Sequence, residues 1–134
     1  MRILAAAAVL VSTSAFAVQL PDRTFFSGND IYQWCQHDKA MAQGYVAGMY
    51  DTAAHATIAI DSMRNFGKAM PNNDAQVDFA IERVVGFCKP EHATLEQMTD
   101  MFCKFLKDTP AQRDGLPAIL FNDAGKKSWR CPGK

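Results

Sequence analysis

The sequence has little of what marks the common functional classes. Its 134 residues carry 14 basic and 14 acidic side chains, so the formal net charge at pH 7 is zero. A nucleic-acid-binding domain needs a basic patch or stripe, and stable attachment to anionic lipid needs a polybasic run. Because the sequence has neither, we expect no nucleic-acid partner and no stable anchoring to a membrane.

Alternation of apolar and polar residues, the pattern of β-strands, is absent over any useful length. Apolar residues recur instead at helical spacing, between stretches that contain proline, glycine and asparagine. These features predict an all-α fold, a small bundle of four to five helices whose short connections favour antiparallel neighbours.

The N-terminus has the pattern of a secretory signal peptide. Two residues, Met1 and Arg2, give a basic start, and an apolar run follows at residues 3–11. The sequence Ala15-Phe16-Ala17 then forms a small-x-small cleavage site. A membrane anchor is the rival interpretation, but a spanning helix needs about 20 apolar residues. We expect residues 1–17 to be removed after Ala17, which leaves residues 18–134 as one exported, periplasmic domain.

The helices can be placed from start and stop signals. The first is predicted to begin at Ser27 or Asn29 and to run to about Met63, and a loop follows to Asn73. A second helix is predicted from residue 74 to Pro90, and a third begins at the Thr94–Gln97 capping box. One helical turn is expected after Pro110, and a short helix over residues 117–124. In the first helix Gly44 and Gly48 lie close to one stripe, where small residues allow another backbone to pack closely, within one subunit or between two.

Four cysteines remain in the exported chain, and an even number in that setting suggests two disulfides. They are Cys35, Cys88, Cys103 and Cys131, with no CxxC pair. In an antiparallel bundle the start of the first helix and the end of the second share one end. This arrangement favours Cys35–Cys88 and leaves Cys103–Cys131, among the three connectivities that four cysteines allow.

Residues that could carry catalysis or bind a metal are few. The three histidines show no metal-ligand spacing, so we expect no metal and no cofactor. Asp51 and His55 are four residues apart on a helix, which is more often an ordinary surface pair than an acid–base pair. His37 lies near Cys35, but a cysteine nucleophile needs a free thiolate. We therefore expect the protein not to be an enzyme.

The order of several short motifs resembles the Rap/Tai family, immunity proteins against type VI secretion amidase effectors. The first are Gly28-Asn29-Asp30, Trp34-Cys35 and the GYVAG segment from Gly44 to Gly48, followed by Asp51. The later landmarks are Phe87-Cys88 with Pro90, Thr94 with Gln97, Leu106 with Pro110 and Arg113, Ala118, and Cys131-Pro132. The sequence departs from the family pattern at Ala42, where many members have a cysteine, and Cys103 is additional.

The resemblance implies a small periplasmic helical protein, often a homodimer, that neutralises a peptidoglycan amidase by occluding its active site. The residues themselves suggest Arg64, Asn65 and Phe66 as binding anchors, because an exposed aromatic beside an arginine is a common hot-spot pair. The alternative is a small helical periplasmic stress or chaperone-like protein that binds unfolded clients and has no toxin partner.

Overall fold

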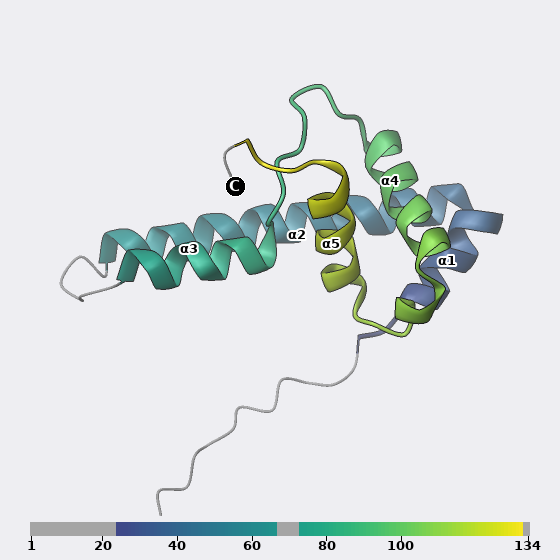
Figure 1. The fold of residues 1–134 in the computed structure, drawn as a ribbon, viewed down its shortest axis with the longest axis horizontal. Coiled ribbons are helices and arrows are strands. Elements are labelled where there is room, and N and C mark those ends of the chain that lie inside the picture. Colours follow the sequence, from purple (N-terminus) through teal and green to yellow (C-terminus); the bar gives the residue numbers. More distant parts are fainter. Residues whose placement is uncertain (1–23, 67–72, 133–134) are drawn as a thin grey trace, which may run out of the picture.

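The computed structural model describes residues 24–66 and 73–132, and of residues 64–66 and 73 it describes the backbone alone. The predicted signal peptide and its cleavage site at Ala17 lie outside the described residues. Five α-helices and one short 3-10 turn make up the described chain, which contains no strand (Figure 1). Their bounds are α1 Gly28–His37, α2 Lys39–Phe66, α3 Asn73–Val84, α4 Leu95–Asp108, η1 Pro110–Gln112 and α5 Pro117–Ser128. The predicted all-α, disulfide-stapled fold is confirmed.

The molecule consists of a body and a projecting arm. In the body, α1, α4 and α5 surround the first half of α2, whereas α3 lies alongside the second half of α2 and forms the arm with it (Figure 1). At 1.5 Å per residue the 28 residues of α2 span about 42 Å and the 12 residues of α3 about 18 Å. Thus α3 covers less than half of α2 and ends where the arm meets the body.

The long first helix predicted from the sequence is two helices that meet at Asp38. This residue has φ −147° and ψ 77°, outside the helical region, and its backbone N–H donates to the carbonyl of Trp34. Its side-chain oxygen accepts from the backbone N–H of Met41 at 3.1 Å. Asp38 therefore ends α1 and caps the start of α2, a position that suits aspartate.

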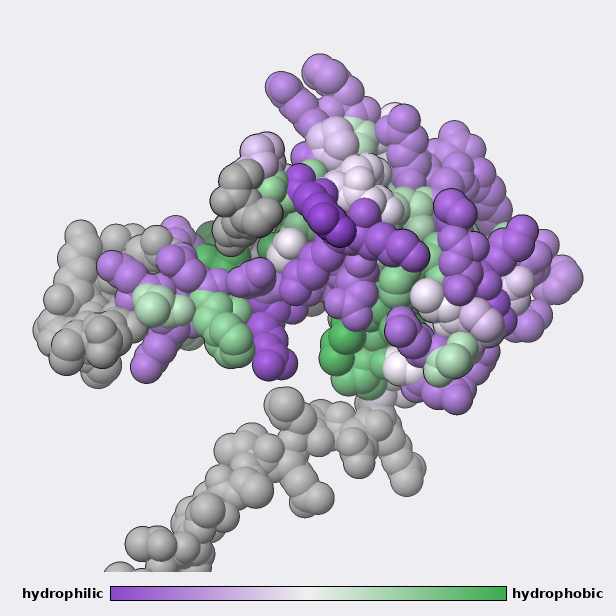
Figure 2. Space-filling view, viewed as in Figure 1, coloured by the Kyte–Doolittle hydropathy of each residue, from purple (hydrophilic) through white to green (hydrophobic). Residues whose placement is uncertain are grey.

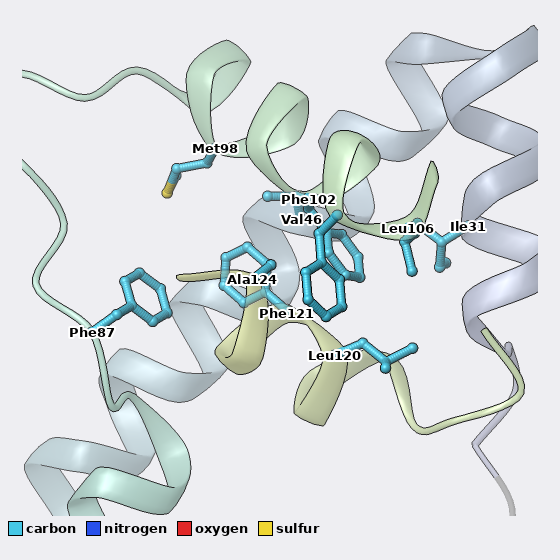
Figure 3. Close-up of a cluster of buried hydrophobic side chains, with 10 residues drawn as sticks. Ile31, Val46, Phe87, Met98, Phe102, Leu106, Leu120, Phe121 and Ala124 are labelled. Carbon is cyan, nitrogen blue, oxygen red and sulfur yellow. The ribbon is translucent and has the colours of Figure 1, made fainter. Parts of the chain in front are cut away.

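Aromatic rings fill the centre of the body, between α4, α5 and the segment that follows α3 (Figure 3). Phe121 meets Phe102 and Phe87 edge to face, with ring centroids 5.4 and 5.6 Å apart. Ile31 of α1 and Leu106 of α4 are fully buried against this cluster. The predicted start of α4 is confirmed, because Thr94 and Gln97 form a capping box.

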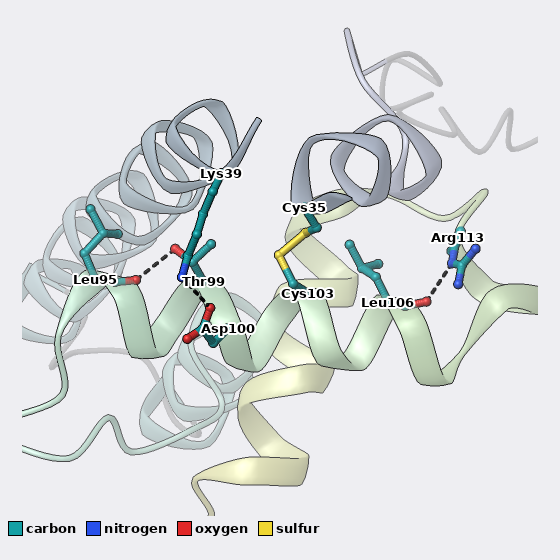
Figure 4. Close-up of a disulfide and its surroundings, with 8 residues drawn as sticks. All are labelled: Cys35, Lys39, Leu95, Thr99, Asp100, Cys103, Leu106 and Arg113. Atoms are coloured by element: carbon teal, nitrogen blue, oxygen red, sulfur yellow. Dashed lines mark hydrogen bonds and ion pairs between the residues drawn. A yellow bond between two sulfur atoms is a disulfide. The ribbon is translucent and has the colours of Figure 1, made fainter. Parts of the chain in front are cut away.

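The predicted disulfide pairing is wrong. Cys35 of α1 is bonded to Cys103 of α4, with Cα atoms 5.7 Å apart (Figure 4), and Cys88 is bonded to Cys131 at 4.9 Å. The prediction failed because α3 is too short to return to the start of the helical pair. Cys88 therefore emerges near the middle of α2, whereas a disulfide requires Cα atoms within about 7 Å.

The connection between α3 and the body is made by a buried asparagine of α5. The side-chain oxygen of Asn122 accepts from the backbone N–H of Gly86 at 2.7 Å. Its amide nitrogen donates to the carbonyls of Glu82 and Arg83, both at 3.3 Å. The free carbonyls at the end of α3 thereby gain hydrogen-bond partners from α5. Helix α3 ends at Val84, earlier than the predicted Pro90, and α5 continues past its predicted end at Ala124 to Ser128.

Arg113 links the end of α4 to α1. Its Nε donates to the carbonyl of Leu106 at 2.6 Å (Figure 4), and its guanidinium lies 3.6 Å from the centroid of the Tyr32 ring. A carbonyl at a helix C-terminus has no partner within the helix, so this arginine caps α4. The contact fixes α1 beside α4, where the Cys35–Cys103 bond also holds it.

Candidate protein-binding surfaces

The stripe of small residues on α2 faces outward. A Cβ atom added at Gly44 or at Gly48 would meet nothing within 4 Å. Among the described residues, the expected close packing at these glycines is therefore absent. Because the stripe lies on the surface of the described structure, it is available to another molecule.

These glycines form part of a groove of about 580 Å³ that we call the glycine groove. Its lining comes from α2, from the end of α3 and from the start of α5: Gly44, Tyr45, Gly48, Met49, Thr52, Ala53, Ala56, Arg83, Val84, Ala118 and Ile119. Arginine is the only charged side chain among them. Burial raises the pKa of the Tyr45 hydroxyl, which places the phenol in partly apolar surroundings.

A second hollow continues the glycine groove around the base of the arm. It is lined by Phe79, Glu82, Arg83, Ile119, Asn122, Asp123 and Lys126. Arg83 and Ile119 line both hollows, and the Arg83 guanidinium lies 5.0 Å from the centroid of the Phe79 ring. Figure 2 shows an indentation between the arm and α5, with hydrophobic surface on the α5 side. A contiguous exposed apolar patch on a protein surface commonly marks an interaction site.

A different groove, of about 680 Å³, lies at the other side of α5 and is here called the C-terminal groove. Met101, Phe105 and Trp129 supply its apolar surface. Its polar rim includes Asp108, whose pKa is lowered by the hydrogen bond that Lys104 donates to it at 2.8 Å. Because Lys104 and Asp108 form an ion pair, their opposite charges largely cancel, and this part of the rim has no strong electrostatic potential of one sign.

The Cys88–Cys131 bond ties together two walls of the C-terminal groove. One wall follows Cys88 in the sequence, at Pro90 and Ala93, and the other ends at Trp129. The backbone N–H of Cys88 also donates to the carbonyl of Trp129 at 3.0 Å. This groove therefore depends on the oxidised cysteine pair, whereas the glycine groove is built from helices alone.

The candidate catalytic residues do not come together. His37 ends α1, His55 lies on α2 and His92 lies in the segment before α4, all of them exposed. Cys35 is disulfide-bonded and therefore has no thiolate to act as a nucleophile. Within residues 24–66 and 73–132, no group of three or more His, Cys, Asp and Glu side chains is placed to hold a metal ion. No helix of the described chain is both long and apolar enough to cross a bilayer.

The predicted binding anchors occupy the last turn of α2, at the outer end of the arm. The backbone of Arg64, Asn65 and Phe66 is helical, whereas the loop was predicted to begin at Arg64, and their side chains lie outside the described part. Met63, just before them, is 60% exposed. Sequence reasoning missed Phe79 and Ile119, and the only signal for them was a large apolar residue on an otherwise polar helix face.

These features define a small, disulfide-stapled helical domain with apolar surfaces suited to binding another protein. The sequence profile of the Rap1a immunity proteins matches residues 27–131, which covers every helix described above. The chain therefore belongs to the Rap1a immunity protein family, as the resemblance of its motifs predicted. No curated protein and no solved structure matches the chain.

Proposed function

We propose that this chain is exported to the periplasm and neutralises a peptidoglycan amidase effector of a type VI secretion system by occluding the amidase's active site. The observation that carries the proposal is the match to the Rap1a immunity profile over nearly the whole helical domain. Immunity proteins bind a partner effector, so the chain acts by binding, without catalysis of its own. The resemblance of its motifs also supports a homodimer as the working state.

The arm is the part of the molecule whose shape suits entry into a cleft. It is two helices wide and stands away from the body (Figure 1), whereas the body is a broad surface. Each helix with its side chains is about 10–12 Å across. The arm tip carries the residues proposed as anchors, Arg64, Asn65 and Phe66, next to the exposed Met63. Arginine and aromatic side chains dominate binding energy at such contacts.

Charge reversal at the arm tip tests this arrangement. We expect Arg64→Glu to weaken the complex with the proposed target, a peptidoglycan amidase effector, by about 30-fold or more, the loss typical of a hot-spot residue. The matched control is Lys107→Glu, the same charge change at an exposed position of α4 in the body. Isothermal titration calorimetry measures affinity, and peptidoglycan hydrolysis measures inhibition.

Four outcomes can be distinguished. Loss of binding and inhibition with Arg64→Glu alone supports occlusion by the arm tip. Equal effects of both variants would show that the net charge of the chain acts, rather than the tip. If the double variant Arg64→Glu with Phe66→Ala still inhibits, the arm tip is not the surface that occludes the amidase. An unmodified chain that binds no amidase at all would overturn the proposed function.

A further inference from the structure

The glycine groove opens where the chain enters the body. Just before α1, the ring of Phe26 packs against the ring of Tyr45, which lines the groove, with centroids 5.8 Å apart. On α5, Ile119 also lines the groove. Its neighbour Leu120 lies so close to Gly28 that a Cβ added at the glycine would come within 2.6 Å of its side chain. The described chain therefore begins between α2 and α5, at the end of the groove where Tyr45 lies.

The sequence that precedes this point is long enough to cover the groove. Removal of residues 1–17, as proposed above, leaves residues 18–23 (VQLPDR) ahead of the described chain. Six extended residues reach about 20 Å. Along α2 the groove runs from Gly44 to Ala56, which is about 18 Å at 1.5 Å per residue. The segment can therefore follow the groove for most of its length.

The chemistry of residues 18–23 matches that of the groove. Residues 18–21 (VQLP) carry no charged side chain, and the groove beside α2 is lined by apolar and small residues. Proline fixes its own φ and disfavours helix in the residue before it, so Leu20-Pro21 favours an extended backbone. Extended segments that contain proline commonly bind in grooves that present an aromatic ring, which here is Tyr45. The charged residues 22 and 23 adjoin the described chain, at the groove's open end.

The floor of the groove admits a backbone close to α2. A Cβ added at Gly44 or Gly48 would meet nothing within 4 Å among the described residues. Ile119 of α5 is 56% exposed. A segment that lies over the glycines also covers this isoleucine, and removing apolar side chains from water on both sides stabilises the contact.

We infer that residues 18–23 of the mature chain, here called the N-terminal strap, lie along the glycine groove, with Leu20 and Pro21 over Gly48. Covalent attachment favours this occupant, because a short tether gives an effective concentration in the millimolar range. In this position the strap ties the start of α1 to the base of the arm, and any partner that uses the groove must displace it. The inference rests on the cleavage after Ala17 in the proposed function and not on the identity of the effector.

A disulfide trap tests the position of the strap. The mature chain with Leu20→Cys and Gly48→Cys is oxidised, and its non-reduced peptides are mapped by mass spectrometry. The matched control combines Leu20→Cys with Met41→Cys. Met41 is 52% exposed, does not line the groove and lies four residues before Tyr45, whereas Gly48 lies three residues after it. We expect the pair at positions 20 and 48 to close within one molecule at least about ten times as often as the control pair.

Tryptic cleavage after Arg23 gives a second measurement. Gly48→Leu fills the floor of the groove and should remain folded, because a side chain there meets no other described part of the chain. If it displaces the strap, cleavage should be faster by about threefold or more, since proteolysis follows the population of the open form. Met41→Leu, which changes an exposed side chain outside the groove, should leave the rate unchanged.

The outcomes separate the possible occupants. Closure at positions 20 and 48 alone, with the native pairs Cys35–Cys103 and Cys88–Cys131 intact in the same map, supports the inference. Equal closure of both engineered pairs, or closure of neither, would overturn it. Closure between two molecules would also overturn it and would assign the groove to a second copy. A trapped chain that inhibits no amidase overturns the proposed function alone, whereas an inhibiting chain whose pair stays open overturns the strap alone.

Discussion

Replacing Asn122 by aspartate should expose how strongly the arm is fixed to the body. Asn122 is 6% exposed. Its side-chain oxygen accepts a hydrogen bond from the backbone N–H of Gly86, and its amide nitrogen donates to two carbonyls at the end of α3. Asn122→Asp keeps the size and the acceptor but turns the donating nitrogen into an oxygen that faces the carbonyls of Glu82 and Arg83. At neutral pH a buried carboxylate would lie against two oxygens, which is unfavourable.

The loss of stability has two parts. Losing the donated hydrogen bonds costs about 1 kcal/mol in net stability. Burial and the two carbonyls also raise the pKa of the introduced carboxyl, and a pKa higher by one corresponds to a loss of about 1.36 kcal/mol. This second part cannot exceed about 4 kcal/mol at pH 7, because the carboxyl would otherwise remain protonated, starting from an unfolded-state pKa of about 3.9. We expect a total loss of about 2–5 kcal/mol at pH 7.

The loss should depend on pH with a definite sign. The folded-state pKa of the introduced carboxyl lies above its unfolded-state value. The ionisation penalty is therefore absent below about pH 4 and grows as the pH rises toward the folded-state pKa. In acid the protonated oxygen can also donate to one carbonyl, so only about 1 kcal/mol of the deficit should remain.

Urea unfolding followed by far-UV circular dichroism measures this deficit at pH 4 and pH 7. The matched control is Asp123→Asn, the reverse chemical change at the adjacent, exposed position, which should stay within about 0.5 kcal/mol of the unmodified chain. A loss below about 0.5 kcal/mol for Asn122→Asp, or the same loss at both pH values, would show that Asn122 does not hold the end of α3 through its donated hydrogen bonds.

Two further predictions concern the staples and the glycines. Replacing Cys88 and Cys131 together by alanine should cost about 4 kcal/mol, from the loop entropy of a 43-residue separation, in guanidinium unfolding without reductant. A loss under about 1 kcal/mol would show that the unfolded chain is constrained in another way. Gly125→Ala should destabilise the chain by about 1–3 kcal/mol, because its Cβ would collide with the ring of Phe87. Gly44→Ala, open on its outer side, should instead stabilise α2 by about 0.5–1 kcal/mol when measured on dilute, monomeric chain. The same sign at both glycines would contradict the packing described here.

Local signals predicted much of the fold. The capping box at Thr94 located the start of α4, and Pro117 located that of α5, because caps and prolines act on their own neighbours. The break at Asp38 was missed, since the apolar spacing continues across it and only one side-chain hydrogen bond marks the cap. Sequence patterns at helix starts are thus more reliable than those that separate two consecutive helices.

Features that depend on distant parts of the chain could not be predicted in this way. The disulfide partner of Cys88 depends on where α3 ends along α2. The one available signal was that the helix predicted from residue 74 to Pro90 is shorter than the helix before it. Asn122 is an ordinary polar residue in the sequence and gains its role only when the end of α3 is brought against α5. The glycines on α2 left packing within one subunit and packing between two equally open, and only the fold places them on the surface.

Neutralisation of the amidase is tested most directly by a titration of peptidoglycan hydrolysis. A peptidoglycan amidase effector, the proposed target, is mixed with increasing amounts of the mature, oxidised protein. We expect the amidase activity to fall linearly and to end near equimolar protein, with a complex of fixed stoichiometry on size-exclusion chromatography. Full amidase activity in the presence of excess chain would contradict it, and so would binding only to assorted unfolded proteins, the behaviour of a chaperone.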